Sequence, residues 1–509
     1  MNGELPQAPR MEPFRIKQRD RQSIELKFRY MLDRERRRKR QTYDVNVYFF
    51  LPYSFNINSA SYDRNSFYDD LKLYLRFNTP ALQIGELLDK TSRASPLRRI
   101  ERMIRTARRE DRRIDPDEFI YEGKLLGCIY KSILRDRFAN FATQTDPDTI
   151  SRTLASIGEI REVARRFHRA TSILVRRLKN VEPHVRQHML MIDEHLSLLI
   201  EKYAATLYET LRRSHPLVPH VSRLISKEVR YREKAGYPTV VRGKAPKEKL
   251  EERIYREKML KRYVSEVLFF DVRRRNTAKG MEQILYAAAA GIAMMFATSI
   301  AFLGQSTFGS LTTALFLLLV VSYMLKDRLK DFFRDLLRKS VSRRIFDRKA
   351  MLYDARRHSK LAVVRERTYF LENSQVDPGV IDLRNQGTFE QALARTTAES
   401  LFVYHKRIQL QTKTMRGIHR RIGGVADISI LDLGGFLRHL AAQGGLVPVE
   451  SDRGVVELHP VKRIYHLNLI VHMRSDVGAD IRRYRLIVDA SGIERIEAVS
   501  VGQPVQTPG

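Results

Sequence analysis

The sequence predicts an integral membrane protein with a two-helix transmembrane hairpin, a mainly α-helical N-terminal cytoplasmic part with a short β element, and a small α+β C-terminal cytoplasmic domain. Three observations lead to this prediction. Residues 283–325 contain no charged side chain, basic residues flank that run on both sides, and the apolar pattern changes from helical spacing to alternation near residue 376. The formal net charge of +33 also requires an anionic neighbour, such as lipid headgroups or nucleic acid.

The N-terminal part is expected to begin with a basic arm, residues 1–40, followed by a mainly helical domain, residues 41–212. Residues 43–51 alternate and are rich in β-branched and aromatic side chains, which predicts a strand that ends at Pro52. A helix capped by the Ser66 hydroxyl is expected to follow, up to the turn at 78–80. Three prolines then divide the helical pattern: Pro116, Pro147 and Pro183.

The segments nearest the uncharged run are predicted from their prolines, glycines and apolar spacing. Residues 213–246 are expected to form a hinge or loop. An amphipathic helix, residues 247–282, should lead to the membrane, and residues 326–375 should form a basic amphipathic helical region. We expect the two helices to pack their apolar stripes together. The alternatives are a helix that lies on anionic lipid and a helix that contacts a partner protein.

The uncharged run is too long for one membrane span. It has 43 positions, whereas a span needs about 20. Small and polar residues at 304–309 predict a turn, which gives spans of about 283–303 and 310–325. The alternative is a hairpin buried in a large soluble domain.

Basic residues next to a span are retained on the cytoplasmic side of a membrane. They precede the first span at Arg273, Arg274 and Arg275, and they recur after the second. The expected location is therefore a membrane, with a bacterial inner membrane as the simplest case and both termini cytoplasmic. The single cysteine, Cys128, agrees with a reducing compartment, because one cysteine forms no intrachain disulfide.

Small residues recur every four positions along the first span, which predicts a stripe where another helix packs closely: Ala289, Ala293, Ala297 and Ala301. We expect this stripe to be filled by the second span of the same chain, through Leu315, Leu318 or Leu319. The alternative is a homodimer in which the stripe pairs two copies of the chain.

The C-terminal part is expected to be an α+β domain, residues 376–502, followed by a tail, residues 503–509. A short helix is predicted at 433–442, and strands are predicted at 401–410, 464–473, 484–488 and 493–499. The last two strands flank Asp489-Ala490-Ser491-Gly492. This tetrapeptide predicts a hairpin turn, because glycine adopts a positive φ at little cost.

The sequence contains no recognisable catalytic motif. We find no phosphate-binding loop, nucleophile elbow or zinc-binding cysteine pair, so no catalytic residue and no cofactor is predicted. His184, His188 and His195 share one edge of a helix. His184 and His188 are close enough to share a metal ion, whereas His195 lies too far along the axis. The alternative for this pair is a polar or partly buried helix edge.

The basic clusters are expected to contact anionic lipid headgroups. The first cluster consists of Arg36, Arg37, Arg38, Lys39 and Arg40. Because aromatic residues follow it from Tyr43 onward, a nucleic-acid surface is the less favoured alternative. The second cluster is Arg273 to Arg275.

These features suggest a membrane-anchored scaffold or regulatory adaptor that faces the cytoplasm and has an unknown protein partner. From a different functional class, the alternative is a membrane-tethered nucleic-acid-binding protein. A third hypothesis is an enzyme with an unrecognised site.

Overall fold

The computed structural model describes residues 13–32, 39–110, 114–141, 147–177, 181–211, 215–241, 243, 245–276, 278–308, 312–342, 346–386, 399–418, 423–450, 456–476 and 478–499. The chain divides into two compact units. We name them the sheet unit, residues 1–75, 270–418 and 426–509, and the helical unit, residues 76–269 and 419–425. Each unit is therefore assembled from stretches that are far apart in the sequence.

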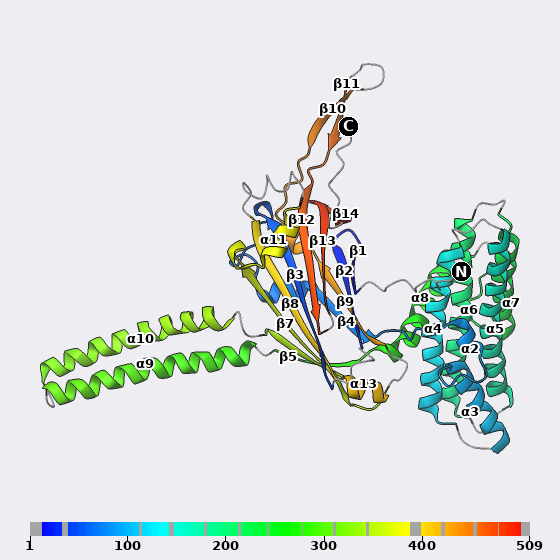
Figure 1. The fold of residues 1–509 in the computed structure, drawn as a ribbon, viewed down its shortest axis with the longest axis horizontal. Coiled ribbons are helices and arrows are strands. Elements are labelled where there is room, and N and C mark those ends of the chain that lie inside the picture. The colour runs from blue at the N-terminus through cyan, green and yellow to red at the C-terminus, as the bar shows by residue number, and fades with distance from the viewer. Residues whose placement is uncertain are drawn as a thin grey trace, which may run out of the picture. The chain divides into compact units, whose positions relative to one another are not determined.

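The sheet unit contains two large sheets (Figure 1). One has eight strands in the order β14-β13-β12-β3-β8-β7-β6-β5, and its neighbouring strands are antiparallel. The other has four strands in the order β1-β2-β9-β4, and β10 and β11 form a separate ribbon. The strands are β1 Phe14–Gln18, β2 Ser23–Met31, β3 Gln41–Pro52, β4 Leu71–Phe77, β5 Asp271–Asn276, β6 Arg348–Tyr353, β7 Lys360–Leu371, β8 Glu399–Leu410, β9 Gly424–Asp432, β10 Gly445–Glu450, β11 Val456–Val461, β12 Tyr465–Ser475, β13 Ala479–Asp489 and β14 Gly492–Val499.

The hydrophobic core of the sheet unit lies on both faces of the eight-stranded sheet. On one face, the rings of Phe49, Phe67 and Phe402 pack with centroids 5.1 to 6.4 Å apart. On the other face, Val380 and Leu383 pack against residues of β3, β8 and β12. The central strands are thus buried on both sides, which explains why β3 has a continuous apolar run. The helices of this unit are α1 Arg64–Asp70, α9 Ala278–Phe308, α10 Thr313–Ser342, α11 Pro378–Arg384, α13 Thr412–Ile418 and α14 Gly434–Leu437.

The predicted fold class is wrong in how it divides the chain. The strand expected near Tyr43 is present as β3, but it pairs with β12 on one side and with β8 on the other. N-terminal and C-terminal segments therefore share one sheet, and they do not form a helical part and a separate α+β domain. Every strand must satisfy its backbone hydrogen bonds, and local patterns do not reveal which distant strand does so. The structure is an α+β fold with large antiparallel sheets.

The prediction of a two-helix transmembrane hairpin is also wrong. Among the described residues, the one helix long and apolar enough to cross a membrane is α9, over Gln283–Thr307. The uncharged part of α10, Thr313–Leu325, extends about 20 Å, whereas a bilayer core is about 30 Å thick. The first helix also continues through the predicted turn to Phe308, which leaves fewer apolar residues for the second.

The helical unit is a bundle in which four of the described helices begin at a proline. A missing backbone N–H costs nothing at the first turn of a helix, so proline is tolerated there. The residues predicted as a hinge, 213–246, contain α7, which ends at Gly236 with a φ of 74°. The helices are α2 Ile84–Leu88, α3 Pro96–Glu110, α4 Pro116–Phe141, α5 Pro147–Arg177, α6 Pro183–Thr210, α7 Val218–Ala235 and α8 Lys247–Ser265.

Other local predictions also differ from the structure. Asp63, not Ser66, caps α1, because its carboxylate accepts a hydrogen bond from the Ser66 backbone N–H at 2.8 Å. The helix ends at Asp70 and the chain continues as β4, although the apolar spacing predicted helix up to residue 75. Behind α10, where helix was also predicted, residues 348–371 contain β6 and β7. The helix predicted over residues 247–282 ends at Ser265, and β5 follows it. The predicted basic arm, residues 1–40, contains β1 and β2. Pairing within the sheets overrides the local patterns in these places.

Candidate functional site

The helices α9 and α10 pack against each other as an antiparallel pair, and their apolar side chains are largely exposed. Figure 1 shows the pair as two long helices side by side. Among the side chains of the pair that the structure describes, eight large apolar ones are more than 60% exposed, namely Ile284, Met295, Phe302, Leu303, Phe316, Tyr323, Met324 and Phe332. An exposed apolar surface of this size is unusual for a monomer in water and marks an interaction site.

The strands that precede and follow this helix pair in the chain are neighbours in the eight-stranded sheet. β5 directly precedes α9, β6 follows α10, and the two strands are antiparallel with Asn276 opposite Arg348. The chain therefore leaves the eight-stranded sheet and returns to the same edge of it. This geometry brings the charged ends of α9 and α10 together.

The predicted alanine stripe of α9 faces α10 of the same chain. Ala289 and Ala293 are fully buried, and the Ser322 hydroxyl of α10 donates a hydrogen bond to the Ala297 carbonyl at 3.4 Å. Further along, Gly304 continues the stripe, since a Cβ there would lie 2.4 Å from Leu318. Ala301 is half-buried. Pairing of two copies through this stripe stays a prediction.

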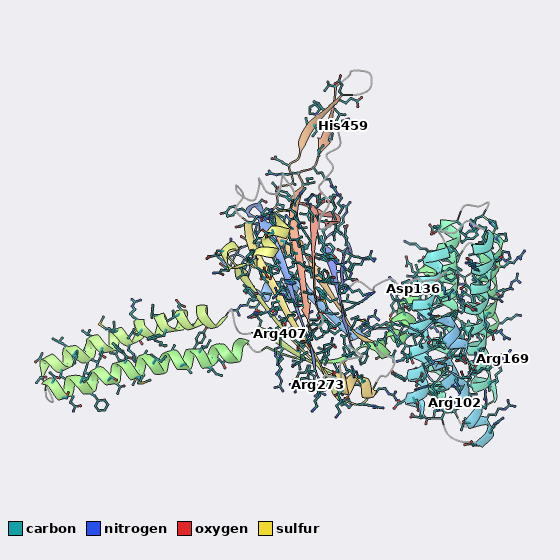
Figure 2. The ribbon with its side chains drawn as sticks, viewed as in Figure 1. Arg102, Asp136, Arg169, Arg273, Arg407 and His459 are labelled. Carbon is teal, nitrogen blue, oxygen red and sulfur yellow. The ribbon has the colours of Figure 1, made fainter. Side chains whose placement is uncertain are left out.

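The predicted basic clusters lie in different parts of the sheet unit. Arg36, Arg37 and Arg38 lie outside the described residues, and Lys39 and Arg40 are exposed just before β3. The second cluster lies on β5, where all three arginines are exposed (Figure 2 labels Arg273). Arg273 stacks over the Tyr353 ring at 4.6 Å, and Arg274 donates a hydrogen bond to the Leu73 carbonyl.

The predicted histidine pair lies on α6. The His184 and His188 rings have centroids 6.0 Å apart, and the His188 Nδ1 lies 2.7 Å from the Tyr263 hydroxyl. Burial lowers the pKa of His188. In the part of the chain that the structure describes, no three His, Cys, Asp or Glu side chains are grouped to hold a metal ion. A metal bound by the two histidines therefore stays a prediction.

The interior of the helical unit contains a network of buried charges centred on α6. Asp193 accepts a hydrogen bond from the Tyr237 hydroxyl at 2.7 Å and lies 2.6 Å from the His168 Nδ1. Glu194 accepts paired hydrogen bonds from Arg256. A buried charge is costly unless it is paired, and these partners come from α5, α8 and the segment after α7. The network thus joins α6 to its neighbours in the bundle.

A cationic groove of about 540 Å³ lies between α3 and α5 in the helical unit. On α3, Arg98, Arg102 and Arg105 recur at i, i+4 and i+7, so they share the face opposite the buried apolar residues. On α5, Arg165 and Arg169 are four residues apart and project from the facing helix. The charged residues that line this cationic groove are Lys90, Arg98, Arg102, Arg105, Arg108, Arg165, Arg166, Arg169, Glu101 and Glu162.

The carboxylates of the groove neutralise only two of its cations. Arg166 donates to both oxygens of Glu101 at 2.8 and 2.5 Å, and Arg165 donates to both oxygens of Glu162 at 2.7 Å. With eight basic and two acidic side chains, the lining keeps a formal charge of +6. Five of the cations make no hydrogen bond or ion pair with any residue that the structure describes, namely Lys90, Arg102, Arg105, Arg108 and Arg169.

The cationic groove was not predicted from the sequence. The arginine spacing on α3 and α5 is visible there, but it is equally typical of a solvated helix face. Only the packing of α3 beside α5 shows that the two basic faces converge. Cys128, by contrast, offers no reactive thiol at neutral pH, because burial raises its pKa to about 12.

Comparisons with protein-family models, with curated proteins and with solved structures find no match to this chain.

Proposed function

We propose that the protein is a membrane-anchored adaptor whose anchor is α9, packed against α10. The sheet unit and the helical unit would then be its interaction surfaces. The observation that supports this proposal best is the exposure of the apolar residues of both helices. A helix as apolar as α9 in the core of a water-soluble domain would be mostly buried. Lipid is the environment in which such a surface costs least.

Many exposed apolar side chains of the helix pair would leave water together if the pair entered a bilayer. Transfer of one large apolar side chain out of water is worth about 1.5–3 kcal/mol. Phe302 and Leu303 on α9 are 70% and 67% exposed, and Phe316 on α10 is 65% exposed. A few such residues outweigh the ordering cost of seating the helices in a bilayer. All three lie close in sequence to the connection between α9 and α10, which is the part of the pair farthest along the chain from β5 and β6.

Aromatic and basic residues mark where the helix pair would meet the headgroups. On α10, the Lys326 ammonium lies 3.9 Å from the centre of the Tyr323 ring. Between the helices, the Arg334 guanidinium lies 4.3 Å from the centre of the Tyr286 ring. Such pairs suit the interface, where an apolar stem and a charged end meet different environments. Anionic headgroups would be the partners of these cations.

The paired strands β5 and β6 flank the helix pair in sequence and lie at the edge of the eight-stranded sheet, so both ends of the helix pair are close to that sheet in sequence. The basic residues at these ends favour the cytoplasmic face, which in a bacterium is that of the inner membrane. The cytoplasmic face of a bacterial inner membrane is therefore the location that we propose.

The anchor is tested by fractionating cells that express the full chain and variants of it. Substitution of Phe302, Leu303 and Phe316 with Ser should move the protein from the membrane fraction to the soluble fraction. The matched control replaces Leu446, Val447 and Leu458 with Ser, because these exposed apolar residues lie on the β10–β11 ribbon. Recovery of the parent protein in the soluble fraction would contradict the anchor.

The adaptor role is tested separately, by purifying the full chain from detergent with and without nuclease. A co-purifying protein that survives nuclease treatment would support an adaptor. Release of the co-purifying material by nuclease would favour the membrane-tethered nucleic-acid-binding protein instead.

A further inference from the structure

We propose that the cationic groove between α3 and α5 is a binding site for a compact ligand that carries several phosphate groups. The groove lies entirely within the helical unit. The inference therefore depends on neither the membrane anchor nor the position of the sheet unit.

The charge of the groove is unbalanced. Its two carboxylates are each held by one arginine in a paired hydrogen bond, and the lining still keeps a formal charge of +6. Like charges that converge on one cavity repel, and this repulsion is relieved when an anion enters. One monovalent anion leaves most of the charge unbalanced, so the fitting ligand carries several negative charges.

The cations of the groove are of a kind that suits phosphate. Seven of the eight basic side chains are arginines. A guanidinium is planar and presents parallel N–H donors that match two oxygens of one phosphate. Arg102, Arg105 and Arg169 are exposed and make no bond to any residue that the structure describes, so their donors are available to a ligand. Figure 2 labels Arg102 and Arg169, which come from the two facing helices.

The size and the lining of the groove limit the ligands that it can hold. Its volume of about 540 Å³ lies within the range of small-molecule sites, about 300–1,000 Å³. Its apolar lining is limited to Ile104, Ala170 and Ile173, and none of the described lining residues is aromatic. Nucleic-acid bases are held mainly by stacking on aromatic rings, and a hydrophobic ligand needs more apolar wall. A small polyol or a short chain that carries clustered phosphates needs neither aromatic rings nor a large apolar wall, so it fits this groove.

Clustered phosphates occur both on free metabolites and on lipid headgroups. The phosphate groups, which the two kinds of ligand share, are what the groove would bind. The experiment therefore has two arms, both with the full chain. In detergent, calorimetric titration uses inositol hexakisphosphate and inorganic tripolyphosphate as probes. In the second arm, flotation compares vesicles of phosphatidylcholine alone with vesicles that also contain cardiolipin. Binding in the first arm identifies a soluble ligand, and a gain confined to cardiolipin vesicles identifies a headgroup.

The groove is tested by the double substitution Arg102→Gln and Arg169→Gln. Neither side chain has a partner among the described residues, so helix content should be unchanged by circular dichroism. A hydrogen bond to a charged group is worth about 1.5–3 kcal/mol, so loss of both should weaken binding about 100-fold or more. The matched control, Arg223→Gln with Arg230→Gln, removes the same charge from exposed positions of α7 that do not line the groove. It should weaken binding by no more than about threefold.

Three outcomes would overturn the proposal. The first is that neither arm shows binding to a phosphorylated probe above the binding of sulfate or of phosphatidylcholine vesicles. The second is an equal loss of affinity in the two double variants, which would indicate a diffuse charge effect. The third is displacement of inositol hexakisphosphate by a lower concentration of a single-stranded oligonucleotide or an acidic peptide, dependent on Arg102 and Arg169, which would assign the groove to a macromolecule.

Discussion

Buried charges, each with a specific partner, stand out among the individual residues. In the sheet unit, Lys406 on β8 and Asp427 on β9 are both fully buried, and the Lys406 Nζ lies 2.7 Å from a carboxylate oxygen. The Tyr30 hydroxyl donates to the same carboxylate at 2.9 Å. The pair joins the two sheets. Such an ion pair contributes little net stability against an apolar pair but costs much when one member is lost.

Replacement of Lys406 with Met should therefore destabilise the sheet unit by about 3–5 kcal/mol, because Asp427 is left charged without its cation and Glu366, 3.5 Å from the Lys406 Nζ, loses one as well. The double variant Lys406→Met with Asp427→Leu should recover only part of this loss, because Glu366 stays buried without that cation. Urea unfolding followed by far-ultraviolet circular dichroism measures both. A single variant as stable as the parent would show that the carboxylate finds another partner.

His195 on α6 should make the helical unit sensitive to acid. Its side chain is buried, and the burial, reinforced by nearby lysines, lowers its pKa to about 3. The pKa in the unfolded chain is about 6.5, so between these values the unfolded state binds a proton that the folded state does not. Stability should fall as pH decreases from about 6.5 towards about 3.

Substitution of His195 with Gln should flatten this pH dependence. The measurement is the urea midpoint at several pH values between about 7 and about 4. The matched control is His459→Gln on the exposed β11 strand, which should keep the slope of the parent. An unchanged slope in the His195 variant would assign the acid sensitivity to other groups.

At the scale of single elements, the hairpin turn between the last two described strands follows its local sequence. The turn at residues 489–492 joins β13 and β14 as expected, and the Asp489 carboxylate accepts hydrogen bonds from the Ser491 and Gly492 backbone N–H groups. Gly492 has a φ of 153°, and a Cβ there would lie 2.3 Å from the Arg21 carbonyl oxygen. The turn residue thus also packs against the β1–β2 connection.

Gly492→Ala should destabilise the sheet unit by about 2 kcal/mol or more, from an unfavourable φ and from the contact with Arg21. Gly445→Ala on β10 is the control, because a Cβ there meets no atom within 4 Å. Thermal unfolding measures the difference. Equal stability of the two variants would show that the β1–β2 connection can move aside.

For the whole molecule, the main consequence of the fold is that the C-terminal part depends on the N-terminal part. β3 lies between β12 and β8, with a register that runs from Gln41 to Pro52 along β8. Residues 376–502 alone would therefore leave two long strands without their shared neighbour. The unpaired backbone groups and the apolar side chains of that gap would be exposed.

A fragment of residues 376–502 should accordingly fail to fold, although the sequence suggests an autonomous domain. We expect no cooperative unfolding transition for this fragment, whereas the full chain in detergent should show one for its sheet unit. Addition of a peptide of residues 41–52 should restore some β structure. A fragment that unfolds cooperatively by itself would mean that β12 and β8 pair directly.

The sequence alone determined local features whose cause is local. The prolines at 116, 147 and 183 begin α4, α5 and α6, because the ring fixes φ and removes an N–H that the first turn does not need. The alternating run near Tyr43 forms a strand for a similarly local reason. The uncharged run gives helix α9. The tertiary structure decided which strands are neighbours and where α9 ends.

The candidate sites divide in the same way. The sequence identified the apolar residues of α9 and the basic residues of β5, since composition suffices for both. It did not identify the cationic groove, because Arg102 and Arg169 are 67 positions apart and converge only when α3 packs beside α5. A basic helix face has the same pattern whether it meets water or another basic face. The electrostatic energy depends on the distance between charges, and that distance is set by the packing of the helices.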